Sequence, residues 1–365
     1  MNELLEINAI DDWLKQGDSR VLIAGPCSAE SEEQLLLTAS AIATNFPHNI
    51  FRAGVWKPRT RPGTFEGVGQ KGLAWLKAVK QQTGMRVATE VANAKHVEAA
   101  LNAGIDFLWI GARTSVNPFF VQEIADALQG VDVPVLVKNP LHPDLQLWLG
   151  ALERIQRAGI KKLAAVHRGF FTYEKTEYRN APRWEAIIEL KTQHPQLPVI
   201  CDISHIAGNT HLLPVVAQQS IDLDMAGLMI ETHYQPAKAL SDVEQQVNPQ
   251  QLFDMVSGLK MRKSTFDDER LTLSLESIRK KIDLLDCSLL EVLDERMQLV
   301  KDIGALKDAG EVSIFQIMRW SSIVRQCLLK ADELGLNRNF VKNILIQIHD
   351  ESIRIQSEIM NKKNP

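Results

Sequence analysis

A chain of 365 residues is too long for a single ordinary core and suits one large domain followed by a small one. Its net charge of −4 gives no reason to expect nucleic acid as a partner, and no apolar run approaches the roughly 18 residues that span a membrane. The first residues include acidic side chains and lack the apolar segment of a signal peptide, and four scattered cysteines do not resemble a disulfide framework. We therefore expect a protein of the reducing cytoplasm.

Residues 20 to about 258 alternate short, β-rich apolar runs with segments long enough for a helix. The runs are continuously apolar, which is typical of parallel strands covered on both faces. Eight evenly spaced units in roughly 240 residues favour a closed (β/α)8 TIM barrel of the α/β class over a doubly wound open sheet. We assign residues 1–258 to the barrel. The predicted strands are 20–25, 50–56, 86–91, 107–112, 134–139, 162–167, 198–203 and 227–232.

The rest of the chain lacks strand signals. Residues 259–272 are polar and charged, which indicates a linker. Residues 273–310 carry apolar side chains mostly three or four positions apart, as at Ile278 and Ile282. This spacing predicts one long amphipathic helix that ends near Gly310.

Two shorter helices are predicted after it, at 316–333 and 338–361. Residues 273–365 are therefore expected to form an all-α domain of three helices. The long helix would leave apolar surface exposed in a monomer unless a second copy covers it. We expect a homodimer through this domain, and a higher assembly remains open.

Charged side chains lie at the carboxyl ends of the predicted strands, where barrel enzymes have their active sites. Ion pairs between the cations and acids of this rim are one explanation, but the cations outnumber the acids. A binding site for a ligand with phosphate and carboxylate groups is the other. The cations are Arg52, Lys57, Arg113, Lys138 and Arg168. The acids are Glu90, Asp202 and Glu231.

A candidate metal site lies on the same rim. Strand eight of a closed barrel lies beside strand one, so Cys27, His205 and Glu231 can converge although they are distant in sequence. Asp242, in the loop after strand eight, can reach the same point. Such a mixture of sulfur, nitrogen and oxygen ligands suits a divalent transition ion. The alternatives are a buried thiol that packs as a small hydrophobe and a hydrogen-bonded loop histidine.

Seven motifs in order, GPCS, KPRT, GAR, VKNP, HRG, DISH and the Glu-Thr-His end of strand eight, resemble the 3-deoxy-D-arabino-heptulosonate 7-phosphate (DAHP) synthase family in its short barrel form. The resemblance implies a TIM barrel that condenses phosphoenolpyruvate with erythrose 4-phosphate, the first step of aromatic amino-acid biosynthesis. It implies a divalent ion, with Mn²⁺ expected first and Fe²⁺, Zn²⁺ or Co²⁺ as alternatives. The implied metal ligands are Cys27, His205, Glu231 and Asp242.

The resemblance also implies substrate contacts. Arg59 and Thr60 would hold the phosphate of erythrose 4-phosphate. Glu90 would handle the proton of the water that adds to the substrate, unless it pairs with a rim cation. Lys57 and Lys138 would act both in binding and in catalysis. The implied phosphoenolpyruvate contacts are Arg52, Lys57, Arg113, Lys138 and Arg168.

A sister enzyme, which makes 3-deoxy-D-manno-octulosonate 8-phosphate from arabinose 5-phosphate, shares this barrel. It usually has Lys-Ala-Asn-Arg where this chain has Lys57 to Thr60, and Pro58 therefore favours the four-carbon sugar. One departure from the DAHP synthase pattern is Arg61, where many members have Ser.

The helical tail resembles the all-helical chorismate mutase family, in which helices of two chains share each site. The resemblance implies that the tail binds chorismate and rearranges it to prephenate. Gln316 and Trp320 depart from the family, which often has acids at these positions. Two hypotheses follow: a working mutase, or a binding module whose ligand, chorismate or prephenate, regulates the barrel. The implied contacts are Arg279, Arg296, Lys307, Arg319 and Gln356, with Arg296, Lys307 and Gln356 catalytic.

Overall fold

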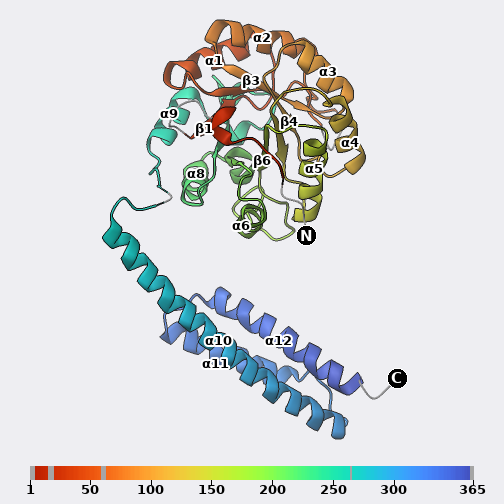
Figure 1. Cartoon of the computed structure of the whole chain (residues 1–365), viewed down its shortest axis with the longest axis vertical. Helices are drawn as coiled ribbons and strands as arrows, with labels where there is room; N and C mark the ends of the chain where they lie inside the picture. The colour runs from red at the N-terminus through yellow and green to blue at the C-terminus, as the bar shows by residue number, and fades with distance from the viewer. Residues whose placement is uncertain (1–4, 15–19, 59–62, 264, 362–365) are drawn as a thin grey trace. The chain divides into compact units, whose positions relative to one another are not determined.

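The computed structural model describes residues 5–14, 20–58, 63–263 and 265–361, which divide into two compact units, Met1–Ser264 and Thr265–Pro365. Figure 1 shows the first unit as a ring of strands surrounded by helices, and the second as a set of long helices. In the ranges described, no helix is both long and apolar enough to cross a membrane.

Parallel strands β1 to β8 form a closed barrel in sequence order, which confirms the predicted fold. Strand β8 pairs with β1, and the register places Glu231 beside Gly25. The second predicted run was too long: β2 ends at Arg52, and the chain beyond it turns so that Gly54 donates to the Cys27 carbonyl. The strands are β1 (Val21–Gly25), β2 (Ile50–Arg52), β3 (Arg86–Val91), β4 (Phe107–Ile110), β5 (Val135–Lys138), β6 (Leu163–His167), β7 (Val199–Asp202) and β8 (Gly227–Glu231).

Helices cover the outside of the barrel (Figure 1). Several begin at a polar side chain that accepts backbone N–H groups left free in the first turn, for example Ser31, Asn117 and Asp144. The helices are α1 (Glu32–Asn45), α2 (Lys71–Thr83), α3 (Ala94–Asn102), α4 (Pro118–Ala127), α5 (Leu145–Arg157), α6 (Trp184–Gln193), α7 (Ile203–Ala207), α8 (Leu213–Asp222) and α9 (Pro249–Ser257). Short 3-10 helices are η1 (Ile10–Asp12), η2 (Pro236–Lys238) and η3 (Val243–Gln245).

Two apolar clusters hold the barrel together, because successive side chains of a strand point to opposite faces. One cluster packs between the strands and the helices. The other fills the barrel interior and includes Ile50, Phe107 and Leu136. Two residues further along the same strands lie Arg52, Trp109 and Lys138. Because every second side chain of a strand points into the barrel, Arg52, Trp109 and Lys138 lie above the apolar interior, at the carboxyl end of the barrel.

The second unit consists of α10 (Glu269–Ala309), α11 (Ile317–Glu333) and α12 (Arg338–Asn361). The predicted linker extended too far, because α10 begins four residues before position 273, where Asp268 caps it by accepting the Arg270 N–H. Helix α12 packs against α10, as Figure 1 shows. At their crossing a Cβ on Gly304 would lie 3.1 Å from the Ile359 side chain, so a small residue allows this close approach.

Most apolar side chains of α10 are exposed. Of its described residues only Val300 and Gly304 are buried. Leu284 and Leu285 are both 69% exposed. A helix of 41 residues that buries so little within its own unit has a large apolar surface available for a partner.

Candidate functional sites

Three of the four predicted metal ligands converge at the carboxyl end of the barrel. The ligand atoms of Cys27, Glu231 and Asp242 all lie within 4.8 Å of one another. The Cys27 Sγ is 3.0 Å from Asp242 Oδ2. The closure of β8 on β1 brings Cys27 and Glu231 together, and the loop that follows β8 brings Asp242.

The fourth predicted ligand, His205, lies beside this cluster in the short helix α7. Its Nε2 is 3.9 Å from Glu231 Oε1, and its Nδ1 is 2.9 Å from Asp202 Oδ2. Burial lowers the pKa of His205 although Asp202 opposes this shift. A neutral imidazole oriented by a carboxylate, with its other nitrogen toward the cluster, is the usual arrangement of a histidine that binds a metal.

The charges around the cluster also suit a cation. Burial, and then the Glu231 carboxylate, raises the pKa of the Cys27 thiol to about 12. Burial opposes ionisation of Asp242 too, but Arg179 and His205 outweigh it and hold the pKa of Asp242 below its ordinary value. A sulfur ligand must lose its proton when it binds a metal, and a divalent ion supplies the charge that favours this loss. The residues present therefore fit a divalent transition ion.

Two of the five rim cations form buried ion pairs. Arg52 donates to Glu231 Oε1 at 3.1 Å, and Lys138 donates to Asp202 Oδ2 at 2.6 Å. For these two, the ion-pair explanation is correct. Glu231 belongs to the ligand cluster and Asp202 contacts His205, so the pairs connect the cation rim to the candidate metal site. Removing one partner of such a buried pair costs about 3–5 kcal/mol.

The other rim cations are arranged differently. The Lys57 ammonium donates to the Cys27 carbonyl at 3.0 Å and lies 2.9 Å from the Cys27 sulfur. Arg113 is exposed, whereas Arg168 is buried and donates to Asn180. Burial lowers the pKa of Arg168 to about 10; Asp202 opposes this, and Arg179 and Arg113 add to it. Guanidinium groups close enough to repel one another form a site that an anion would stabilise.

Arg59 and Thr60, predicted to hold the second phosphate, lie outside the described residues. Glu90 accepts a hydrogen bond from the Trp109 indole at 3.1 Å. Although burial opposes both shifts, the negative charge of Glu90 also contributes to raising the pKa of Arg52 and of Lys57.

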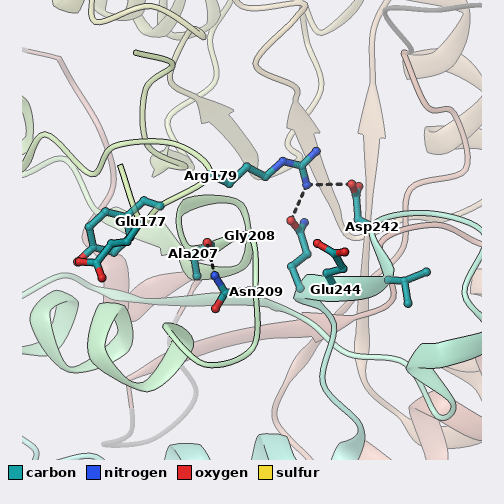
Figure 2. Close-up of a pocket in the computed structure, with 10 residues that line it drawn as sticks. Glu177, Arg179, Ala207, Gly208, Asn209, Asp242 and Glu244 are labelled. Atoms are coloured by element: carbon teal, nitrogen blue, oxygen red, sulfur yellow. Dashed lines mark hydrogen bonds and ion pairs between the residues drawn. The ribbon is translucent and has the colours of Figure 1, made fainter. Parts of the chain in front are cut away.

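Arg179 and Gln245, which no sequence motif indicates, contact the predicted metal ligands. Arg179 donates to Asp242 at 2.9 Å and to Gln245 at 2.5 Å, and Gln245 donates to Glu231 at 2.7 Å. Figure 2 shows Arg179 reaching from the loop after β6 to Asp242. These contacts join loops distant in sequence, and no local pattern marks them. They border an open pocket of about 550 Å³, lined by Glu177, Tyr178, Arg179, Ala207, Gly208, Asn209, Asp242, Val243, Glu244 and Gln245.

The second unit places several predicted mutase residues near one another. Arg296 on α10 donates to the Ser352 hydroxyl on α12 at 2.7 Å. Gln356 is one turn further along α12, and it is buried with its Oε1 unpartnered among the described residues. Lys307, also on α10, donates to the Ile314 carbonyl. Arg319, near the start of α11, is exposed.

Arg279 does not join this group within one chain. It precedes Arg296 by 17 residues on the same helix, a separation of about 25 Å at 1.5 Å per residue. It is instead exposed and paired with Glu276 at 2.7 Å. A single substrate of ordinary size cannot contact both arginines of one chain.

The two departures from the mutase pattern lie at the start of α11. Trp320 stacks on His349 of α12, with ring centroids 4.1 Å apart and planes at 19°. Gln316 occupies the N-cap position of α11 without a side-chain cap. Burial lowers the pKa of His349, and Arg296 and Lys307 contribute although Asp350 opposes them. A stacked aromatic pair therefore replaces an acid near the predicted mutase site.

Comparison with known proteins agrees with both units. A family model described as DAHP synthetase I family matches residues 6–266, and one described as chorismate mutase type II matches residues 278–357. A phospho-2-dehydro-3-deoxyheptonate aldolase of Thermotoga maritima is 30% identical over 262 residues, which cover 70% of this chain and 75% of that relative. A 2-dehydro-3-deoxyphosphooctonate aldolase of Variovorax paradoxus is 27% identical over 242 residues, which cover 60% of this chain and 82% of that relative.

Solved structures give the same result. The crystal structure of the Thermotoga maritima DAHP synthase matches with a TM-score of 0.61 at 29% identity, over 69% of this chain and 72% of that one. A truncated form of the Thermotoga enzyme matches with a TM-score of 0.58 at 27% identity, over 69% of this chain and 90% of that one. The chain is therefore an enzyme that belongs to the DAHP synthetase I family and carries a chorismate mutase type II domain C-terminal to its barrel in the sequence.

Proposed function

We propose that the barrel condenses phosphoenolpyruvate with erythrose 4-phosphate to give DAHP and inorganic phosphate. The observation that carries this proposal is the cluster of Cys27, Glu231 and Asp242 beside a rim of five cations. Two anionic substrates must meet there, and the cations offset their repulsion. Holding the two in register contributes on the order of 7–11 kcal/mol toward the barrier.

Cys27, His205, Glu231 and Asp242 would hold a divalent ion, with Mn²⁺ expected first. A bound ion of this kind acts as a Lewis acid toward a carbonyl oxygen. The five rim cations, together with Arg179, would bind the carboxylate and phosphate groups. Carbon C3 of phosphoenolpyruvate then attacks the aldehyde carbon and forms the new C–C bond.

Water adds at C2 of the resulting cation, and the hemiketal phosphate then loses inorganic phosphate to leave the ketone of DAHP. Glu90 accepts the proton released when water adds. Its carboxylate lies on the same strand level as Trp109 and is buried, with 9% of the residue exposed. Lys57, which contacts Cys27, and Lys138, which is paired with Asp202, would stabilise the negative charge that changes during the reaction.

We further propose that the helical unit rearranges chorismate to prephenate as a homodimer. The reaction needs no nucleophile, because the enzyme holds the substrate compactly and places cations near the ether oxygen where negative charge develops. Lys307 and Gln356 would flank this oxygen, and Arg296 and Arg319 would bind a carboxylate. The separation of Arg279 from Arg296 supports a shared site in which a second copy supplies Arg279.

A regulatory role of the same unit is compatible with catalysis. Prephenate or chorismate bound there would inhibit the synthase, since a first enzyme joined to a later one is a natural point of feedback.

We also place the protein in the cytoplasm, because its cysteines are free in the described ranges.

The loss of phosphoenolpyruvate, followed by its absorbance with Mn²⁺-loaded protein, tests the barrel proposal. Erythrose 4-phosphate should support consumption and arabinose 5-phosphate should not, because of Pro58. A chelator should stop this reaction and leave chorismate consumption unchanged. Preference for arabinose 5-phosphate would instead assign the reaction named for the octulosonate relatives.

A further inference from the structure

Trp109 is an unusual residue at its level of the barrel. It is fully buried, and it belongs to the apolar cluster that fills the interior. The inward positions at the corresponding ends of neighbouring strands are polar or charged, including Arg52 on β2, Glu90 on β3 and Lys138 on β5. The indole is thus both the top of the apolar interior and the floor of the proposed synthase site.

The indole N–H fixes one of these groups. Glu90 and Trp109 are register partners on β3 and β4, and the Trp109 Nε1 donates to Glu90 Oε2 at 3.1 Å. The other carboxylate oxygen occupies space that the missing side chain of Gly111 leaves free, because a Cβ there would lie 2.1 Å from Glu90 Oε1. One directed hydrogen bond therefore orients the carboxylate, and a glycine at position 111 gives it the space for this position.

The ring face meets two cations. The Arg52 guanidinium carbon lies 5.0 Å from the Trp109 ring centroid, and the Lys138 ammonium lies 5.7 Å from it. Both distances are within the range of a cation–π attraction, which is strongest for Trp and for desolvated cations. Arg52 Nε and Nη1 are buried and have no hydrogen-bond partner among the described residues, so the ring is a favourable neighbour for this charge.

We propose that Trp109 is a positioning residue of the synthase, which holds Glu90 through its N–H and supports Arg52 and Lys138 through its ring face. The inference rests on the proposed synthase reaction. It assigns separate effects to separate parts of one side chain: the N–H acts on the proton-handling step, and the ring acts on phosphoenolpyruvate binding.

Two substitutions separate these parts. Trp109→Phe keeps an aromatic face and loses the N–H donor. We expect kcat to fall roughly 10- to 100-fold, which corresponds to the loss of a hydrogen bond to a charged group. The KM for phosphoenolpyruvate should be nearly unchanged. Trp109→Leu loses the face as well, and we expect the KM for phosphoenolpyruvate to rise about tenfold in addition. In Glu90→Ala protein, Trp109→Phe should lower the residual rate no further.

Trp148 provides the matched control. It is equally buried, and its Nε1 donates to the Val137 carbonyl at 3.1 Å, but it lies in the layer between helices and strands. Trp148→Phe removes a bond of the same length and should lower the unfolding temperature about as much as Trp109→Phe, with kcat unchanged.

An unchanged kcat in Trp109→Phe, or the same loss of rate in the Glu90→Ala background, would overturn the inference. Wild-type protein is assayed with erythrose 4-phosphate beside the variants. An inactive wild type would refute the proposed function itself, whereas an active wild type with an unaffected Trp109→Phe variant would refute only the role of Trp109.

Discussion

At the scale of single residues, the candidate metal site depends on side chains that do not themselves bind the metal. Asp202 orients His205, Gln245 donates to Glu231, and Arg179 donates to both Asp242 and Gln245. These contacts orient three of the proposed ligands, His205, Glu231 and Asp242. Partners of this kind typically change metal affinity by 10- to 100-fold when they are removed.

Arg179 allows a direct test of this arrangement. Arg179→Ala leaves all four proposed ligands in place but frees Asp242 and Gln245, so we expect Mn²⁺ to bind about 10- to 100-fold more weakly. The measurement is a titration of metal-free protein in which unbound Mn²⁺ is read from its paramagnetic resonance signal. Arg154→Ala, at an exposed arginine of α5 bonded to Gln122, is the control and should bind Mn²⁺ as wild type does. Equal affinities in both variants would show that Arg179 does not support the site.

At the scale of elements, the strands were predictable because their signal is local. Each of β1 to β8 lies inside a run of apolar residues, and the rim residues follow from the ends of those runs. The tail helices were predictable from their spacing for the same reason. The start of α10 was missed because a cap by Asp268 outweighs the polar composition of the following residues.

The residues that sequence reasoning missed belong to contacts between elements. The pairing of Trp109 with Glu90 depends on the register of β3 against β4, and the pairing of Arg179 with Asp242 depends on how two long loops pack. Neither has a fixed spacing along the chain. The ion pairs of Arg52 and Lys138 were the alternative to an anion-binding site. They could be foreseen from the sequence, because both partners lie at strand ends that the closed barrel brings together.

Helix α10 exposes many apolar side chains, which favours association with a second copy. Leu285 and Leu289 are 69% and 57% exposed on one side of the helix, and burying each would contribute about 1.5–3 kcal/mol in each copy. The double substitution Leu285→Glu and Leu289→Glu should therefore convert a dimer to a monomer, as measured by sedimentation. Mutase activity should be lost with it, and synthase activity should persist.

The control for this experiment is Lys330→Glu, which changes charge at an exposed position of α11. It should leave both the sedimentation and the mutase rate as in wild type. A monomeric double variant that still converts chorismate at the wild-type rate would mean that one chain completes the mutase site. Arg279 would then have no place in it.

At the scale of the whole molecule, two reactions of one pathway are joined in one chain. The two sites differ in kind: the barrel site is built around a candidate metal cluster, whereas the predicted residues of the helical site are cations and an amide. A product bound in the helical unit can alter the barrel reaction only if it favours one state of the protein over another. Feedback is thus a separate property from catalysis and needs a separate test.

We predict that saturating prephenate lowers the rate of the synthase, measured by phosphoenolpyruvate consumption in the wild-type protein. Arg296→Ala removes a cation that is hydrogen-bonded to Ser352 in the helical unit, so it should abolish mutase activity. The synthase rate without prephenate should be unchanged. The synthase should also become insensitive to prephenate. If Arg296→Ala protein lost mutase activity but remained fully inhibited, prephenate would act at a site other than the mutase site. If prephenate left the wild-type rate unchanged, the helical unit would serve catalysis alone, and the fusion would have to be explained by shared assembly rather than by control.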